Sequence, residues 1–461
     1  MERTSDTFQT IDRTREERMG QEGDGPSARA EQLFDRGGQA LEAEDYPTAL
    51  DCFRQAAEGG HPESQYELGH MYSRGDGVER DRAKGMEWLR RAAEQGHAKA
   101  QSLLGVLSLS DAEEAQDRAE AVEWSRKAAE QDLPIAQYVL GLLYDNGHGV
   151  EQDDAEAVKW YRKAAEQDLP MAQRALGVMY SKGLGVEQDH ARAVEWTRKA
   201  AEQGSARAQC KLGFHYEFGD GVEQDDTQAA EWYRKAAAQG EPIAQLYLGL
   251  MYSDGRGAEQ DRFEAARWFR LAAEQGEVAS QTLLAALYED GEGVEQDDAQ
   301  AAEWYRKAAA QGEPIAQLYL GRMYEEGRGV GQDDAEAMKW YRLAAEQGND
   351  EAQCCLGYMY DGQGVGQDHL EAAKWYEKAA DQGNERALYN LALLYQNGHG
   401  VEQDHAKAAA LYLKAAEQGD PESQFNLGCM YENGEGVEQD HLKAEAWYRK
   451  AAEQGYTGPD G

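Results

Sequence analysis

A 36-residue repeat is the feature of this sequence that most restricts its possible folds. A Leu-Gly or Leu-Ala pair recurs along the chain, and its second residue marks eleven units at intervals of 36 residues, apart from one interval of 35. A unit of this size cannot bury its apolar face alone, so its neighbours must stack on it. The sequence therefore predicts an array that lengthens without thickening. We call the marked residue the repeat glycine, and its positions are Gly69, Gly105, Gly141, Gly177, Gly213, Gly249, Ala285, Gly321, Gly357, Ala392 and Gly428.

Each unit is expected to hold two helices, as residues 134–168 illustrate. Pro134 can begin the first helix (helix A), and the Gly-x-Gly turn at residues 147–149 can end it. Asp153 can cap the second helix (helix B), with Glu156 completing a capping box. A glycine inside a helix costs about 1 kcal/mol relative to alanine. The repeat glycine of helix A therefore indicates a close approach by the partner helix.

Helix B carries all the tryptophans of the chain in one column. The small and aromatic residues Ala157, Trp160, Tyr161 and Ala164 lie at helical spacing and predict one buried stripe. So many exposed tryptophans would promote aggregation, which favours a structural role over a functional stripe. The column comprises Trp88, Trp124, Trp160, Trp196, Trp232, Trp268, Trp304, Trp340, Trp375 and Trp447, with Leu411 in the eleventh place.

These patterns predict an all-α fold, a right-handed α/α superhelical solenoid of about eleven helix-turn-helix repeats. The array is expected over residues 61–455, with a short tail at residues 456–461. Residues 28–60 carry helix-B spacing and are expected to form a divergent N-terminal repeat. Residues 1–27 are charged and lack apolar periodicity, so we expect them to be disordered.

One motif runs through the whole unit. The example reads Ala136-Gln137-x-x-Leu140-Gly141-x-x-Tyr144-x-x-Gly147-x-Gly149-Val150-x-x-Asp153-x-x-x-Ala157-x-x-Trp160-Tyr161-x-x-Ala164-Ala165. This motif resembles the Sel-one-like repeat, a relative of the tetratricopeptide repeat, and its copies cover about residues 63–455. The resemblance implies an α/α solenoid that serves as an adaptor in protein complexes. The unit at residues 105–130 departs from the motif, because residues 110–115 replace its Gly-x-Gly turn.

Composition restricts the partner and the compartment. The chain carries 87 acidic and 47 basic side chains, and its formal charge of −40 would repel phosphate backbones and anionic lipid. We therefore expect no nucleic-acid partner. The sequence also lacks the apolar runs of a membrane span or a secretory signal, so no membrane insertion is expected. Five cysteines at irregular spacing favour reduced thiols and a cytoplasmic location. Adaptation to high salt stays open as another origin of the acidic charge.

The columns that vary between units are the candidates for binding. Residues three before and one after the repeat glycine share one face of helix A, which is concave by analogy with tetratricopeptide proteins. Acidic residues four after the glycine, such as Asp145 and Glu325, would give this groove an acidic rim. A protein or peptide segment with apolar and basic residues would suit it, although packing between repeats explains each single side chain equally well. The candidates are Tyr138, Leu142, Arg174, Phe214, Leu246, Leu250, Leu318, Arg322, Tyr358, Tyr389, Leu393 and Phe425.

No catalytic, cofactor or metal site is predicted. The Gly-x-Gly turns lack the strand and the Gly-Lys-Ser/Thr of a phosphate loop, and the acidic loops lack the ligand pattern of a calcium-binding EF-hand. No nucleophile with a base and an orienting group stands outside the repeat columns. We therefore expect a non-enzymatic protein-interaction scaffold or adaptor that needs no cofactor. The alternative is a saccharide- or cell-envelope-binding protein, or an accessory factor of an envelope enzyme.

Overall fold

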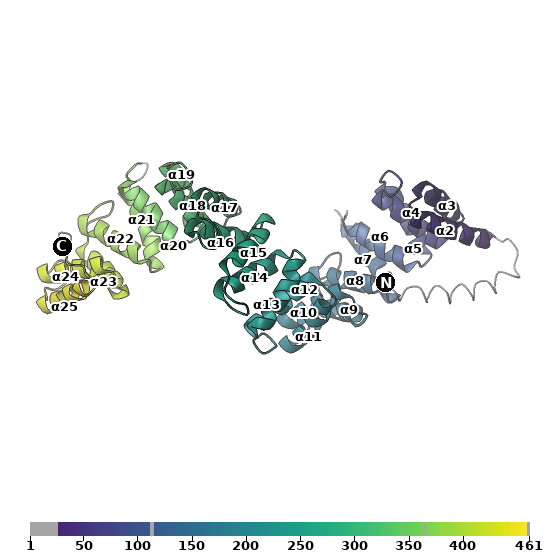
Figure 1. The fold of residues 1–461 in the computed structure, drawn as a ribbon, viewed down its shortest axis with the longest axis horizontal. Coiled ribbons are helices and arrows are strands. Elements are labelled where there is room, and N and C mark those ends of the chain that lie inside the picture. The colour runs from purple at the N-terminus through teal and green to yellow at the C-terminus, as the bar shows by residue number, and fades with distance from the viewer. Residues whose placement is uncertain (1–25, 111–114, 364–365, 459–461) are drawn as a thin grey trace. The chain divides into compact units, whose positions relative to one another are not determined.

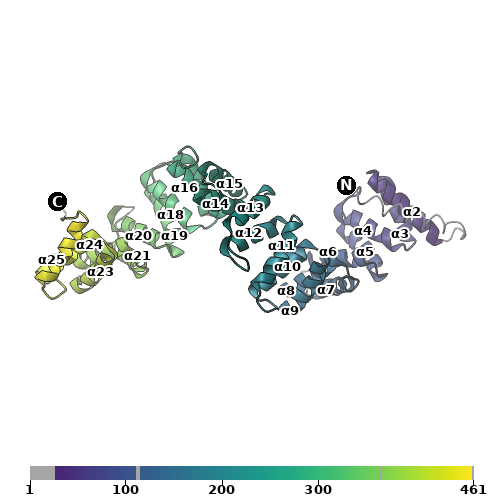
Figure 2. The ribbon, with the colours of Figure 1, turned by 60° about the horizontal axis from the view of Figure 1, so that its bottom comes forward.

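The computed structural model describes residues 26–110, 115–363 and 366–458. Within these ranges the chain forms 24 α-helices and no strand, and successive helices pack as pairs (Figure 1, Figure 2). The arrangement is the α/α solenoid that the sequence predicts. The disorder expected over residues 1–27 lies outside the described residues up to residue 25, and it is wrong for residues 26 and 27, which begin the first described helix. Of the altered turn expected at residues 110–115, residues 111–114 lie outside the described residues.

The chain divides into two compact parts after Asp225, in which even-numbered helices are helix A and odd-numbered helices are helix B. The first part contains α2 (Pro26–Glu42), α3 (Tyr46–Glu58), α4 (Pro62–Arg74), α5 (Arg82–Glu94), α6 (Ala98–Ser110), α7 (Ala115–Glu130), α8 (Pro134–Asn146), α9 (Asp154–Glu166), α10 (Pro170–Lys182), α11 (His190–Glu202) and α12 (Ala206–Phe218). The second part contains α13 (Asp226–Ala238), α14 (Pro242–Asp254), α15 (Arg262–Glu274), α16 (Val278–Asp290), α17 (Asp298–Ala310), α18 (Pro314–Glu326), α19 (Asp334–Glu346), α20 (Asp350–Tyr358), the π-helical turn η1 (Met359–Gln363), α21 (His369–Asp381), α22 (Glu385–Asn397), α23 (His405–Gln418), α24 (Pro421–Asn433) and α25 (His441–Glu453).

An aspartate caps the start of helix B, as the sequence predicts, but the expected capping box does not form. The Asp153 carboxylate accepts hydrogen bonds from the N–H groups of Ala155 and Glu156, each at 3.0 Å, and so caps α9. The reciprocal half of the expected capping box is wrong, because the Asp153 N–H donates to the Tyr144 carbonyl at 3.0 Å. Glu156 forms an ion pair with Lys159 at 2.9 Å instead.

The repeat glycine lies where helix B packs most closely on helix A, as the sequence predicts. A Cβ atom on Gly141 would lie 2.5 Å from the ring of Tyr161 on α9. Gly321 faces the Tyr341 ring in the same way, at 2.7 Å. A larger side chain at this position would therefore push the two helices of one repeat apart.

The second glycine of each Gly-x-Gly turn sets the contact with the preceding repeat. A Cβ atom on Gly185, whose φ is +65°, would lie 2.2 Å from the backbone carbonyl group of Asp154. Gly400 faces the backbone of His369 at 2.3 Å. Because a backbone group cannot rotate away as a side chain can, glycine is the residue that fits these turns.

The tryptophans of helix B are packed rather than displayed. Trp160, Trp304 and Trp375 are buried, and the other seven are half-buried. In most repeats a Lys or Arg one turn later lies over the ring, as Lys235 does over Trp232 at 3.8 Å. These contacts support the structural role expected from the sequence.

A network of glutamines, which the helical periodicity does not predict, joins each repeat to the one before it. Gln137 on α8 is fully buried and donates to the Ala129 carbonyl of α7 at 3.3 Å. Gln167, which follows α9, donates to the Gln137 side-chain oxygen at 2.9 Å. A buried amide must satisfy both its donor and its acceptor, so this network fixes how the repeats stack. Equivalent pairs are Gln95–Gln65, Gln131–Gln101, Gln203–Gln173, Gln275–Gln245, Gln311–Gln281, Gln347–Gln317, Gln382–Gln353 and Gln454–Gln424.

Candidate functional site

The predicted binding residues lie on one side of helix A in successive repeats, and we call this surface the helix-A face. Tyr358 is exposed, Leu318 is buried and the other ten are half-buried. The face is thus partly open to solvent along both parts of the chain. Its predicted members are Tyr138 and Leu142 on α8, Arg174 on α10, Phe214 on α12, Leu246 and Leu250 on α14, Leu318 and Arg322 on α18, Tyr358 on α20, Tyr389 and Leu393 on α22, and Phe425 on α24.

Aromatic members of the face also pack on the core beneath it. The ring centroid of Tyr138 lies 5.7 Å from that of Tyr161, and the ring centroid of Phe425 lies 5.2 Å from that of Tyr448. These contacts join a variable helix-A residue to the helix-B tyrosine of the same repeat, which is buried at Tyr161 and half-buried at Tyr448. Packing and surface display, the two explanations that the sequence left open, therefore both apply to these side chains.

Leu318 is the exception, and its expected place on an open groove is wrong. Its side chain is 2% exposed. It belongs to a core cluster with Tyr341 of α19 and with Ala352 and Leu356 of α20, so the following helix pair covers it. Leu318 therefore offers no surface to a partner.

The acidic residues four after the repeat glycine are bonded inside the repeat. The Asp145 carboxylate accepts a hydrogen bond from the Tyr161 hydroxyl at 3.0 Å, and Glu289 accepts one from Tyr305 at 3.0 Å. Burial raises the pKa of the Tyr161 phenol, and the negative charge of Asp145 raises it further, so the hydroxyl stays a donor. At Asp145 and Glu289 the expected acidic rim is therefore wrong, because each of these two acids holds a buried tyrosine in place.

A hollow of about 440 Å³ lies on the helix-A face of the second part of the chain. Residues of α16, α18, α20 and α22 line it, so helix A of four successive repeats contributes to one concavity. We call it the α18–α22 hollow. The sequence predicted two of its residues, Arg322 and Tyr358, whereas it missed Tyr319 and Arg386. Arg386 lies three residues before Tyr389, one helical turn away, so the same periodicity extended by a turn would have found it.

The charges of this hollow are mostly paired within the protein. Arg322 forms an ion pair with Glu351. Arg328 binds both Glu289 and Glu326, at 2.6 Å each. The formal charge of −40 on the whole chain therefore does not describe this region, where acids and arginines neutralise one another.

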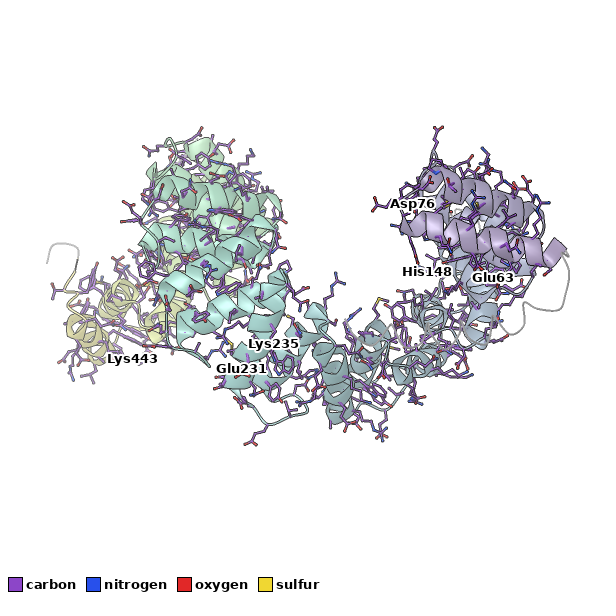
Figure 3. All side chains as sticks on the ribbon, turned by 45° about the vertical axis from the view of Figure 1, so that its right-hand side comes forward. Glu63, Asp76, His148, Glu231, Lys235 and Lys443 are labelled. Carbon is purple, nitrogen blue, oxygen red and sulfur yellow. The ribbon has the colours of Figure 1, made fainter. Side chains whose placement is uncertain are left out.

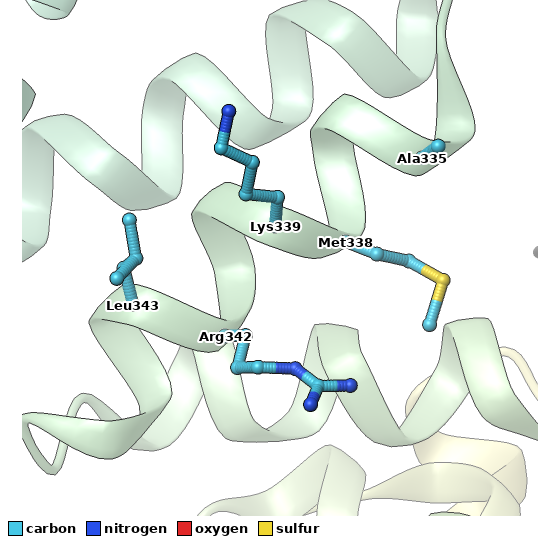
Figure 4. Close-up of a pocket in the computed structure, with 5 residues that line it drawn as sticks. All are labelled: Ala335, Met338, Lys339, Arg342 and Leu343. Atoms are coloured by element: carbon cyan, nitrogen blue, oxygen red, sulfur yellow. The ribbon is translucent and has the colours of Figure 1, made fainter.

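A second hollow, of about 370 Å³, lies on a helix B rather than on the helix-A face (Figure 4). It is lined by Ala335, Met338, Lys339, Arg342 and Leu343, all on α19. Leu343 is 39% exposed and takes the place that a lysine over the tryptophan ring holds in most repeats. This shallow surface is formed by a single helix and brings no set of reactive groups together.

Most of the histidines lie at helix ends or in turns. His369, the first residue of α21, lies with its Nδ1 2.6 Å from an Asp361 carboxylate oxygen, and its ring stacks on that of His399 with centroids 5.2 Å apart. His148 lies in the turn after α8 (Figure 3). Within the described ranges, no group of three or more His, Cys, Asp or Glu side chains is placed to hold a metal ion. Two of the five cysteines, Cys52 and Cys354, are buried.

Twelve contiguous stretches of the chain, from residues 32–61 to residues 421–456, match the Sel1 repeat family. The chain belongs to the Sel1 repeat family. The match at residues 32–61 covers most of α2 and α3, so the N-terminal pair that looked divergent is itself recognised as a Sel1 repeat. Sel1 repeat proteins are generally protein-interaction scaffolds.

Two solved structures resemble this Sel1 repeat protein over most of its length. A protective antigen present in uropathogenic Escherichia coli strains, which displays an SLR fold, is 41% identical with a TM-score of 0.76, and the match covers 87% of this chain and 86% of that one. A Sel1 repeat protein from Oxalobacter formigenes is 42% identical with a TM-score of 0.55, over 67% of this chain and 90% of that one. No curated protein matches the chain. Among the described residues, no helix has both the length and the apolar character that crossing a membrane requires.

Proposed function

We propose that this Sel1 repeat protein is a scaffold that binds a segment of a partner protein along the helix-A face. The observation that carries the proposal is the α18–α22 hollow, to which helix A of four successive repeats contributes. A segment laid across several repeats would contact each of them, and this is the way in which a solenoid offers an extended binding surface. The recurring residues are engaged in packing, so the partner is selected by the residues that vary between repeats.

The composition of the face suits a protein segment better than a highly charged polymer. Half-buried Leu246, Leu250 and Leu393 supply apolar contacts, and Tyr358 supplies an exposed aromatic ring. Interfaces of this kind are centred on aromatic and arginine anchors with polar groups around them. A cytoplasmic location and a non-enzymatic role stay predictions from the sequence, and neither is needed for binding of this type.

Affinity capture with a matched pair of variants tests the proposal. One variant replaces Phe214, Leu250, Tyr358 and Leu393 of the helix-A face by alanine. The control replaces the exposed apolar residues Phe263, Leu370 and Leu442, which lie at the starts of B helices and are 77%, 53% and 80% exposed. We expect the first variant to lose the proteins that the wild type and the control retain from a cell extract, with unchanged helical circular dichroism in all three.

Two outcomes would contradict the proposal. Equal retention of proteins by the wild type and the helix-A variant would show that the face does not select partners. Binding of a glycan array by the wild type, lost in the helix-A variant while protein retention is unaffected, would favour the saccharide-binding alternative instead.

A further inference from the structure

The repeat at residues 350–384 is one residue shorter than the others, and it forms part of the α18–α22 hollow. The deletion falls after helix A, where α20 ends at Tyr358 and continues into the π-helical turn η1 instead of the usual glycine turn. In four other repeats the equivalent acid, Asp145, Glu289, Glu325 or Glu432, accepts a hydrogen bond from the tyrosine of helix B. In this repeat the acid is Asp361, and its carboxylate lies 2.6 Å from the His369 ring nitrogen.

The displaced acid leaves a buried donor without a partner. Tyr376 occupies the position of Tyr161 and Tyr305, and its hydroxyl is buried with no hydrogen-bond partner. Burial raises the pKa of this phenol, so it stays protonated, and Tyr358 and Arg386 of the hollow lie near enough to affect it. The repeat whose length is changed therefore holds a buried hydroxyl without a hydrogen-bond partner.

Arg386 is a cation that lines the hollow. Its side chain is exposed, and no hydrogen bond or ion pair joins it to another residue in the described part of the chain. The thiols of Cys354 and Cys355 line the same hollow. Burial raises the pKa of the Cys354 thiol to about 12 and also raises that of Cys355, so neither thiol supplies a negative charge.

Three carboxylates around the hollow already form hydrogen bonds or ion pairs within the protein. Glu289 is bonded to Tyr305 and Arg328, and Glu325 is bonded to Tyr341. Glu351 is paired with Arg322. What the hollow offers to a ligand is therefore the guanidinium of Arg386 beside the aromatic side chains of Tyr319 and Tyr358, although the chain as a whole is acidic.

We propose that the α18–α22 hollow binds a carboxylate of the partner segment, with Arg386 as its principal contact and Tyr319 and Tyr358 as the walls for a neighbouring apolar side chain. This inference rests on the proposed scaffold function and changes the partner expected from the sequence at this one site, from a basic to an acidic group. Arginine binds a carboxylate through two parallel N–H donors, a geometry that a lysine or a glutamine reproduces only in part.

Four pools of immobilised octapeptides test the carboxylate directly. Three pools have amidated C-termini and share random positions and one fixed leucine, and they differ in a single fixed residue, which is Glu, Gln or Lys. The fourth pool has a neutral fixed residue and a free C-terminal carboxylate. It distinguishes binding of a chain terminus from binding of an acidic side chain. We expect the full-length protein to bind the Glu pool or the free-carboxylate pool about tenfold more strongly than the Gln and Lys pools.

Three variants assign that preference to the hollow. Arg386→Gln should remove the roughly tenfold preference, and Arg386→Lys should keep part of it. Arg449→Gln on α25, an exposed arginine paired only with Glu445, is the matched control and should keep all of it. Equal binding of all four pools, or a preference that survives in Arg386→Gln, would overturn the carboxylate assignment while leaving peptide binding intact. Failure to bind any pool would also overturn the assignment, and the capture experiment with the helix-A variant would then judge the scaffold function separately.

Discussion

The Tyr161 hydroxyl donates a hydrogen bond of 3.0 Å to the Asp145 carboxylate, and this bond ties helix B to the end of helix A within one repeat. The Tyr161 ring lies directly against the repeat glycine Gly141, so the same side chain explains both the missing Cβ and the acid four residues later. A column of acids that suggests a binding rim in the sequence is thus part of the internal frame. The acidic charge of the chain has at least one structural use that involves no partner.

Removing this hydroxyl should destabilise the protein. We expect Tyr161→Phe to lower the free energy of unfolding by about 1–2 kcal/mol, because a hydrogen bond to a charged group is lost. Tyr376→Phe is the matched control, since the Tyr376 hydroxyl has no partner to lose, and it should be neutral or slightly stabilising. Urea unfolding followed by circular dichroism measures both changes, and equal destabilisation by the two variants would contradict the assignment.

The turn glycine Gly185 should tolerate alanine less well than another glycine of the same repeat. Gly185 and Gly204 have positive φ values of +65° and +92°, but only Gly185 has atoms close to the position of an added Cβ. Gly185→Ala should therefore cost about 1–3 kcal/mol more than Gly204→Ala, since the added methyl group meets the backbone of Asp154. Thermal unfolding of the two variants compares them directly. If Gly204→Ala proves as damaging as Gly185→Ala, backbone strain alone is responsible and the contact between repeats is not.

The buried glutamines should matter more than exposed ones. Gln137→Ala removes a side chain that bonds both Ala129 and Gln167, leaving buried polar groups unpaired, and should cost about 2–4 kcal/mol. The control Gln152→Ala changes an exposed side chain and should cost less than about 0.5 kcal/mol. Chemical denaturation gives both values, and a mild effect at Gln137 would show that the network is dispensable.

His215 should make the stability of the first part of the chain depend on pH. Burial lowers the pKa of His215 below its ordinary value of 6.5, and nearby Lys211 lowers it further, whereas Asp220 opposes the shift. Below pH 6.5 the unfolded chain then binds more protons than the folded one. The contribution of His215 to stability is therefore fully present above pH 6.5 and is lost as the pH falls from 6.5 through the lowered pKa of the folded state.

His215→Gln should reduce this pH dependence. The comparison is the change in urea midpoint between about pH 7.5 and about pH 5.5 in the wild type and the variant. A wild-type midpoint that falls no more than that of the variant would contradict the prediction, because the carboxylates common to both proteins would then account for the whole slope.

Periodicity made the helices, the caps and the repeat glycine predictable. Each of these signals recurs in almost every unit, and each reflects a requirement within one repeat, such as capping a helix or allowing close packing of two helices. The Asp153 cap and the Gly141 contact belong to this class. The capping box did not form, because the Asp153 N–H found the Tyr144 carbonyl, a competitor that the local sequence pattern does not reveal.

Equivalent positions did not have equivalent exposure, and this limited the prediction of the site. Leu246 and Leu318 hold the same place in the motif, yet Leu246 is half-buried and Leu318 is covered. Arg386 was missed because only two columns were used to define the face. Leu318 is covered by side chains of the following repeat, which the motif of a single repeat does not contain.

Site-specific photo-crosslinking tests the central claim, that partners bind on the helix-A face, most directly. A photoreactive phenylalanine would be placed at Tyr358 on that face or at Phe263 on α15, which are 42% and 77% exposed. The account predicts that cell extract gives discrete adducts with the probe at residue 358 and none of the same adducts at residue 263, despite the greater exposure of the latter. The same adducts from both positions, or adducts from residue 263 alone, would contradict it.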